Sequence, residues 1–213
     1  MDSEGRPTTR VRRKLERRDA IVNAAGDIIA QKGYARTTME QIAQKAGVGV
    51  ATVYKHFGTK ANILEAIIRP SLELAFAEAE KVIAQPPSDP GVAVAALIDR
   101  YRYLRDGWKD RRLLQVLSML ETENVDVLRK MTTESNARTQ QQIRDLLLVL
   151  KGRGDIDGRL PVDDAASIVF CIFNQHYEFF VSDERISAEK LFADLRRRLQ
   201  LLFTEWRALK RSC

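Results

Sequence analysis

Residues 37–60, TTMEQIAQKAGVGVATVYKHFGTK, decide the fold of this chain. Thr38 stands before a short amphipathic segment and Gln41 follows three residues later, which is the spacing of a capping box at a helix start. The helix is predicted over Met39–Lys45. Gly47 follows it and supplies the positive φ that a tight turn requires. This stretch therefore predicts a short helix that ends in a tight turn.

The segments on either side of this turn are also helical in pattern. A short helix is expected over about Val50–His56, and Thr59 then caps a longer helix over Lys60–Ala84. Upstream, a helix begins near Arg17 and ends at Gly33. Its apolar face is formed by Ile21, Ala25, Ile28 and Ile29, with Val22 beside them. Three helices with a tight turn between the second and third predict a helix-turn-helix, whose shared core is expected to hold Ile42, Val48, Val53 and Phe57.

The rest of the chain continues the helical pattern. Residues 85–91, QPPSDPG, form the clearest loop. No segment shows convincing period-two alternation with β-branched residues, so the fold class is all α. Further amphipathic helices are predicted at 91–105, 109–121, 124–151, 162–182 and 188–210.

Composition places the chain among globular proteins. It has 213 residues, 45% hydrophobic and 30% charged, and its longest uncharged run is too short and too polar to span a bilayer. No apolar stretch follows the basic start, so no secretory signal is predicted. Cys171 and Cys213 lack metal-ligand spacing and are expected to be reduced thiols in a cytoplasm. We expect no metal and no cofactor.

The positive charge is confined to one end of the chain. Residues 1–60 hold twelve Lys and Arg against six Asp and Glu, whereas residues 61–213 hold 23 of each. A neutral body with a basic module at one end is the pattern of a polyanion-binding protein. A solvated basic tail would give the same asymmetry, so charge alone leaves both interpretations open.

The motifs of common enzymes are missing from the sequence. It contains no Walker-type phosphate loop, no GxGxxG after a strand and no HExxH. The stretch around Asp155 and Asp157 carries only a fragment of a calcium-loop pattern, because residue 166 is alanine where that loop needs glutamate. We therefore expect no enzymatic activity.

Residues 18–64 closely resemble the N-terminal domain of TetR-family transcriptional regulators. The matching positions are Ile21, Ala24-Ala25, Lys32-Gly33-Tyr34, Thr37-Thr38-Met39, Ile42-Ala43, Ala46-Gly47-Val48, Thr52-Val53-Tyr54, His56-Phe57, Lys60 and Leu64. The resemblance covers about a quarter of the chain without gaps. It implies about nine helices, with a helix-turn-helix followed by a helical ligand-binding and dimerisation domain. It also implies a homodimeric repressor that binds a palindromic operator in double-stranded DNA and is released by a small-molecule effector.

The expected DNA contacts lie on the recognition helix and its neighbours. Small residues at the start of that helix suit thymine methyl groups, while tyrosine, histidine, lysine and threonine side chains suit phosphate oxygens. In similar proteins the matching Thr, Tyr, His and Lys positions are the usual phosphate contacts. The predicted DNA-binding residues are Thr38, Gly49, Val50, Ala51, Thr52, Tyr54, Lys55, His56 and Lys60. Gly49 and Ala51 depart from the family pattern, which often has Ser and Gly there.

Dimerisation is predicted from the last two helices. The final helix carries an apolar stripe, and the helix before it is apolar on nearly all sides, so that helix must be covered twice. A partner subunit is one cover, and a deeply buried helix in a monomer is the alternative. The predicted interface residues are Ile168, Ile172, Leu195, Leu199, Leu202, Phe203 and Trp206.

An effector pocket is predicted from the resemblance and from the mixed polar and aromatic residues of the central helices. Its candidate lining is Tyr101, Tyr103, Trp108, Met119, Asn174 and His176, although a tyrosine or methionine at helical spacing is more often an ordinary core residue. The polar segment 132–142 either faces solvent or lines a wet cavity. The predicted organisation is a disordered basic arm at 1–14, a DNA-binding domain at 15–60 and an effector-binding and dimerisation domain at 61–213.

One further class of protein fits the basic N-terminal region. Residues 10–29 could form a basic amphipathic helix of a helical adaptor that binds membranes or proteins. Sequence-specific DNA binding with a steep salt dependence would exclude that alternative. The match over residues 37–60 favours DNA, with no membrane partner.

Overall fold

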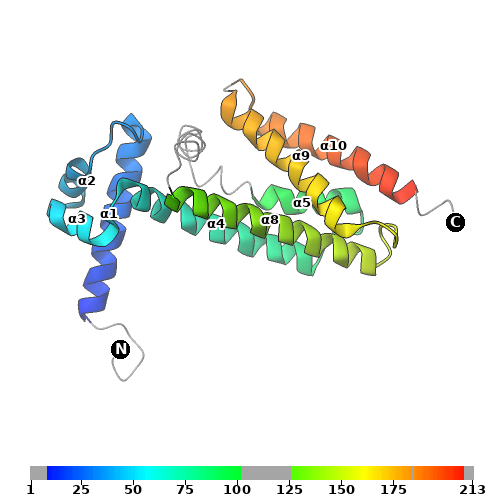
Figure 1. Ribbon diagram of the computed structural model, residues 1–213, viewed down its shortest axis with the longest axis horizontal. Coiled ribbons are helices and arrows are strands. Elements are labelled where there is room, and N and C mark those ends of the chain that lie inside the picture. The colour runs from blue at the N-terminus through cyan, green and yellow to red at the C-terminus, as the bar shows by residue number, and fades with distance from the viewer. Residues whose placement is uncertain (1–8, 102–125, 184, 209–213) are drawn as a thin grey trace. The chain divides into compact units, whose positions relative to one another are not determined.

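The computed structural model describes residues 9–101, 126–183 and 185–208, and every regular element among them is an α-helix (Figure 1). The predicted all-α fold class is thus confirmed, and the predicted helix at 109–121 lies outside the described residues. The described helices are α1 (Thr9–Lys32), α2 (Met39–Ala46), α3 (Val50–Phe57), α4 (Lys60–Ala84), α5 (Pro90–Arg100), α8 (Asp126–Gly152), α9 (Val162–Ser182) and α10 (Ala188–Ala208). None of these helices has the length and apolar character needed to cross a membrane.

The chain divides into two compact units, and α4 runs from one into the other. The first unit comprises Met1–Pro70 and Lys109–Met131, and the second comprises Ser71–Trp108 and Thr132–Cys213. The N-terminal part of the first unit thus ends within α4 at Pro70, ten residues beyond the predicted end of the DNA-binding domain at residue 60. The first turns of α4 belong to the first unit because Ile63 and Ala66 are buried in its core.

The helix ends of the first unit follow the local signals in the sequence. Gly33 and Gly47 both have positive φ, of 84° and 66°, as the predicted turns require. Thr38 and Gln41 form the predicted capping box, in which each side chain accepts a hydrogen bond from the other residue's backbone N–H. Thr59 accepts a hydrogen bond from the backbone N–H of Asn62 and so caps α4. These ends set the turn between α2 and α3.

One apolar core holds α1, α2, α3 and the start of α4 together. Of the four residues predicted for it, Ile42, Val53 and Phe57 are buried and Val48 is packed against it. The remaining buried members are Ile21, Ala25, Ile28, Met39, Ala43, Ile63 and Ala66. Because α3 contributes only one side to this core, its other side is free to face a partner.

The basic N-terminal segment is helical over part of its length. Helix α1 begins at Thr9, so the last six residues of the predicted disordered arm are its first turns. The side chains over 9–19 are all exposed, and burial begins at Ile21. The apolar half of α1 is thus fixed in the core, whereas its basic half extends beyond it.

In the second unit α10 packs against α5 and α9. The apolar stripe predicted on the last helix faces these two helices and is buried there. Its buried members are Leu191, Leu195, Leu199, Phe203 and Trp206. The stripe therefore belongs to the core of one chain.

Candidate nucleic-acid interface

Helix α3 separates its buried and exposed residues cleanly. Val53 and Phe57 point into the core, while Ala51, Tyr54 and Lys55 are exposed. The spacing of 51, 54 and 55 puts these three side chains on one face of the helix. Tyr54 is 49% exposed, so it is a surface residue. A small residue, a phenol and a cation are thus presented together on a short, well-anchored helix.

The start of α3 is organised by its backbone. Gly49 occupies the N-cap position with extended backbone angles and no side-chain cap, and its carbonyl accepts from the N–H of Thr52 at 2.8 Å. Thr52 is half-buried. Val50 is half-buried as well and packs against the core of the unit. Ala51 is accordingly the most accessible side chain among the residues predicted to meet base edges.

His56 lies on α3 within a group of cations. Its ring is half-buried, and burial lowers its pKa from the ordinary value of 6.5, with further lowering by Lys14, Arg17, Lys55 and Arg18. Such a group of cations attracts polyanions. The contribution of α1 to it was missed from the sequence, although counting back from Ile21 at helical spacing would have placed Arg17 and Lys14 on the same side.

Lys60 points into the protein. Its Nζ donates to the carbonyl oxygens of Tyr34 at 2.8 Å and Thr37 at 2.9 Å, and it lies 4.2 Å from the centre of the Tyr34 ring. Burial lowers its pKa. Lys60 therefore joins the start of α4 to the loop before α2, and at most one of its three N–H bonds remains for the phosphate contact predicted from the sequence.

Thr38, another predicted phosphate contact, is exposed and caps α2. Its hydroxyl oxygen accepts from the backbone N–H of Gln41 at 3.3 Å. Accepting this bond leaves the hydroxyl proton available as a donor. Capping and phosphate binding are therefore compatible at this position.

Among the predicted effector contacts, Tyr101 is the centre of a buried polar group. Its hydroxyl donates to Oε1 of Gln142 at 2.9 Å, and Nε2 of Gln142 donates to the carbonyl of Phe76 at 3.0 Å and to Glu80. The Tyr101 ring lies 5.8 Å from that of Phe173. Burial raises the pKa of the phenol, and the charge of Glu80 raises it further. The phenol is therefore a neutral hydrogen-bond donor inside the second unit.

The other predicted pocket residues are placed differently. His176 is buried, and both ring nitrogens have partners, Nδ1 lying 2.6 Å from the carbonyl oxygen of Ile172 and Nε2 contacting the Arg198 guanidinium. Asn174 is half-buried. Three predicted pocket residues, Tyr103, Trp108 and Met119, lie outside the described residues. The structure thus brings Tyr101 into a polar interior and gives His176 a packing role.

The polar stretch 132–142 is partly exposed to solvent and partly buried. Thr139 and Gln142 are buried, while most of the remaining side chains are exposed or half-buried. The Arg138 guanidinium lies 4.3 Å from the Phe76 ring and forms an ion pair with Glu73 at 2.8 Å. The stretch therefore faces solvent along most of its length and reaches the interior at two positions.

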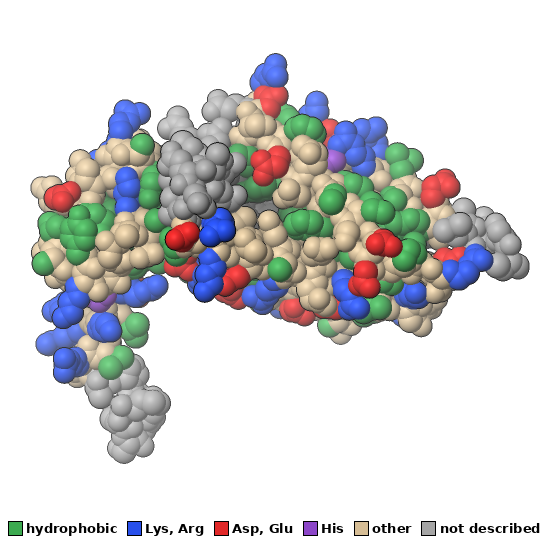
Figure 2. All heavy atoms as spheres, viewed as in Figure 1, with side chains coloured by type: hydrophobic (Ala, Val, Ile, Leu, Met, Phe, Trp, Pro, Cys, Tyr) green, Lys and Arg blue, Asp and Glu red, His purple; other side chains and the backbone are tan. Residues whose placement is uncertain are grey.

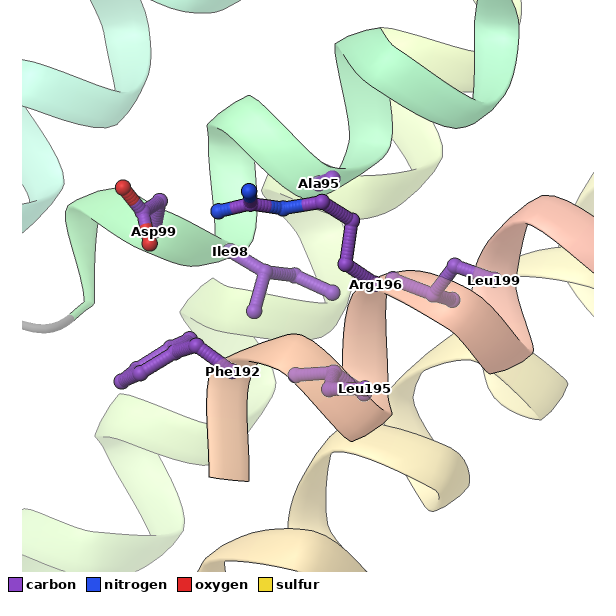
Figure 3. A pocket seen from close by; sticks show the side chains of 7 residues that line it. All are labelled: Ala95, Ile98, Asp99, Phe192, Leu195, Arg196 and Leu199. Carbon is purple, nitrogen blue, oxygen red and sulfur yellow. The ribbon is translucent and has the colours of Figure 1, made fainter. Parts of the chain in front are cut away.

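A small crevice lies between α5 and α10 (Figure 3). Its volume is about 10 Å³, and its lining is Ala95, Ile98, Asp99, Phe192, Leu195, Arg196 and Leu199. A volume of this size holds about one water molecule, whereas sites for small organic ligands measure about 300–1,000 Å³. This crevice is a gap in the packing of α10 rather than an effector pocket.

The residues predicted for the dimer interface fall into two groups. Leu195, Leu199, Phe203 and Trp206 are buried within the chain, because α10 turns this stripe toward α5 and α9. Ile168 is 45% exposed, and Ile172 and Leu202 are half-buried. The sequence pattern located the apolar side of α10 but not the surface that covers it. Further exposed apolar side chains are Phe179 on α9 and Leu201 on α10.

Comparison with known proteins finds a family model that matches the helices of the first unit. Residues 21–67 match the family model described as bacterial regulatory proteins, tetR family. The chain is 26% identical over 159 residues to the HTH-type transcriptional regulator TtgR of Pseudomonas putida, a match that covers 73% of this chain and 75% of TtgR. It is 43% identical over 49 residues to the HTH-type transcriptional regulator HbdR of Aromatoleum sp., which covers 23% of this chain and 21% of HbdR.

Solved structures share the fold over most of the chain. The transcriptional regulator FadR from Bacillus subtilis, in complex with stearoyl-CoA, aligns with a TM-score of 0.65 at 23% identity, covering 87% of this chain and 96% of FadR. SmeT in complex with triclosan aligns with a TM-score of 0.66 at 22% identity, covering 87% of this chain and 90% of SmeT. The family and these relatives are transcriptional regulators and not enzymes. Residues 21–67 thus carry the helix-turn-helix of the tetR-family model, and the described chain shares the fold of these solved structures.

Proposed function

We propose that the chain is a homodimeric repressor that binds a palindromic operator through α3 and is released from it by a small-molecule effector. The observation that carries the DNA-binding half of this proposal is the exposed face of α3, on which Ala51, Tyr54 and Lys55 lie together. A recognition helix is held by its apolar side and reads base edges with the opposite side. Tyr54 and Lys55 then bind phosphate oxygens or guanine at the groove edge.

The dimer is proposed from the exposed apolar residues of α9. Ile168, Ile172 and Phe179 recur at intervals of four and seven residues, so they share one face of the helix. Ile168 and Phe179 are about half exposed, and a row of large apolar side chains in water favours association. A two-fold dimer places two recognition helices about one turn of DNA apart, which is why its operator is expected to be palindromic.

The effector is proposed to bind inside the second unit. Structures of two proteins with this fold contain a small molecule, stearoyl-CoA in FadR and triclosan in SmeT. In this chain the aromatic rings of Phe76, Tyr101 and Phe173 surround the polar group formed with Gln142. An effector that binds more tightly to a dimer with displaced recognition helices lowers operator affinity by the difference between its two affinities.

Changes at Ala51 test the proposed role of α3. Replacing Ala51 by serine or glutamine alters the exposed base-facing surface without touching the core, so we expect a shift in preferred sequence. Each altered base pair should change affinity by about 1–3 kcal/mol. Selection of bound duplexes from random DNA by each variant measures this shift. Equal weakening on every duplex would show that Ala51 does not face the bases.

Operator binding is expected to tighten at lower pH through His56. In the free protein burial and the neighbouring cations hold the pKa of His56 below 6.5. Bound phosphates neutralise those cations and raise this pKa, so the complex takes up a proton and affinity rises as the pH falls from about 8 to about 6. The gain is limited to about tenfold for a rise of one pKa unit. The His56→Gln variant should lose this dependence in binding titrations at both pH values, and retention of it would assign the effect to another group.

A further inference from the structure

The core-facing stripe of α1 changes from apolar to cationic where the helix leaves the first unit. Its apolar members include Ile21, Ala25 and Ile28, all buried. The same helical spacing continued toward the N-terminus reaches Arg17, Lys14 and Arg10, which are exposed. We call these three cations the basic ridge.

The basic ridge lies on the α3 side of the first unit. The guanidinium of Arg18, next to the ridge, lies 5.6 Å from the centre of the Phe57 ring at the end of α3. Lys14 and Arg17 also act on His56, whose pKa is lowered first by burial and then by these cations. Figure 2 shows lysine and arginine side chains crowded along the N-terminal half of α1. The ridge therefore continues the cationic surface of α3.

The opposite face of α1 carries no excess of positive charge. There Arg12 forms an ion pair with Glu16 at 3.5 Å, and Asp19 follows at helical spacing. Among the described residues no carboxylate forms an ion pair with Arg10, Lys14 or Arg17 within 4.0 Å. The positive charge of α1 that no described carboxylate neutralises thus lies on the basic ridge, on the same side of the helix as the apolar core stripe.

We propose that Arg10, Lys14 and Arg17 form a contact surface for the DNA backbone that flanks the base pairs read by α3. The inference rests on the proposed use of α3 as the recognition helix. From Arg10 to Arg17 the helix rises about 10 Å, a length that spans about three phosphates of one DNA strand. Each phosphate contact releases counterions, so the ridge makes binding more dependent on salt and on the length of the duplex.

A lipid surface fits these residues less well than DNA does. A helix that lies on a membrane needs an apolar face for the acyl boundary. The apolar face of α1 is buried against α2 and α3, and in its basic half the exposed apolar residues are Val11 and Leu15, which lie off the ridge. Binding to anionic vesicles is therefore the alternative outcome, and it is measured for the same variants beside DNA binding.

The test compares the double variant Arg10→Gln/Lys14→Gln with Arg12→Gln. Glutamine preserves helix propensity, and Arg12→Gln removes one charge from the opposite face of the same turn. Binding is measured across a salt series on two duplexes recovered by selection from random DNA, one trimmed to the inverted repeat and one extended by five base pairs at each end. Circular dichroism checks that α1 is intact.

We expect the wild type to bind the extended duplex about tenfold more tightly and the double variant to bind both alike. The salt slope of the double variant should fall by about two, and Arg12→Gln should bind like the wild type. An unchanged salt slope in the double variant, or equal weakening of DNA binding by the double variant and Arg12→Gln, would contradict the proposed role of the basic ridge while leaving the function of α3 intact. Loss of vesicle binding without loss of DNA binding would also overturn it. A wild type that selects no sequence would overturn the proposed function itself.

Discussion

Replacing Lys60 by methionine is expected to destabilise the first unit by about 3 kcal/mol. Methionine keeps the length and the apolar stem of lysine but removes both N–H donors, which leaves the carbonyls of Tyr34 and Thr37 without the bonds they accept at 2.8 and 2.9 Å. Hydrogen bonds from a charged donor are worth about 1.5–3 kcal/mol each. The loop that carries the Thr38 cap should loosen, and operator affinity should fall with it. Amide hydrogen exchange of α2 measures the local loss.

The matched control for this change is Lys55→Met. Lys55 is exposed on α3, so its replacement removes the same charge without disturbing the fold of the unit. We expect unchanged exchange rates in α2 and a salt slope lower by about one. A different result would be that Lys60→Met is as stable as Lys55→Met and only lowers the salt slope of operator binding by about one. Lys60 would then be a phosphate contact and would not hold the start of α4 to the loop before α2.

Replacing Phe203 by alanine is expected to destabilise the second unit by about 4 kcal/mol. Phe203 is 2% exposed and packs edge-to-face against Trp206 at 4.8 Å between ring centres. Truncation of a buried phenylalanine removes its transfer free energy and leaves a cavity, for a typical cost of about 3–5 kcal/mol. Urea unfolding followed by circular dichroism should show the loss at several protein concentrations, because association of subunits makes stability depend on concentration.

Leu201, two residues away on α10, gives the opposite expectation. It is 65% exposed, so Leu201→Ala should change stability by no more than about 0.5 kcal/mol at a concentration where the oligomeric state is unchanged. The pair separates two roles for the apolar residues of α10. If Phe203→Ala yielded a well-folded monomer, this stripe would be a subunit interface, as the sequence pattern predicted, and not the core of one chain.

The features predicted correctly from the sequence depend on neighbouring residues. The bounds of α4, the capping box of Thr38 and Gln41 and the positive φ of Gly47 all follow from residues within one turn of the position concerned. Backbone hydrogen bonds and glycine conformation act over this short range. The same local logic assigned Val53 and Phe57 to the core, and their burial leaves residues 51, 54 and 55 on the exposed face of α3.

The features that the sequence did not reveal depend on residues far apart in the chain. An apolar stripe shows that one side of α10 is buried, but not whether a neighbouring helix or a second subunit covers it. Lys60 is linked to carbonyls 23 and 26 residues away, and Tyr101 to Gln142 across 41 residues. Every residue has a backbone carbonyl, so no sequence signal marks a particular carbonyl as the partner of a lysine. The division within α4 is likewise not visible in the sequence, because one continuous helix carries residues of both units.

Selection of duplexes from random DNA by the purified protein, repeated at two salt concentrations, is the most direct test of α3 as the recognition helix of a dimer. We expect an inverted repeat whose half-sites lie about one helical turn apart. Affinity for it should fall by about 10³-fold or more between about 50 and 200 mM salt, as expected for six or more phosphate contacts. Recovery of no shared sequence, or a salt dependence equal for every duplex, would contradict the assignment of α3 as the recognition helix of a dimeric regulator.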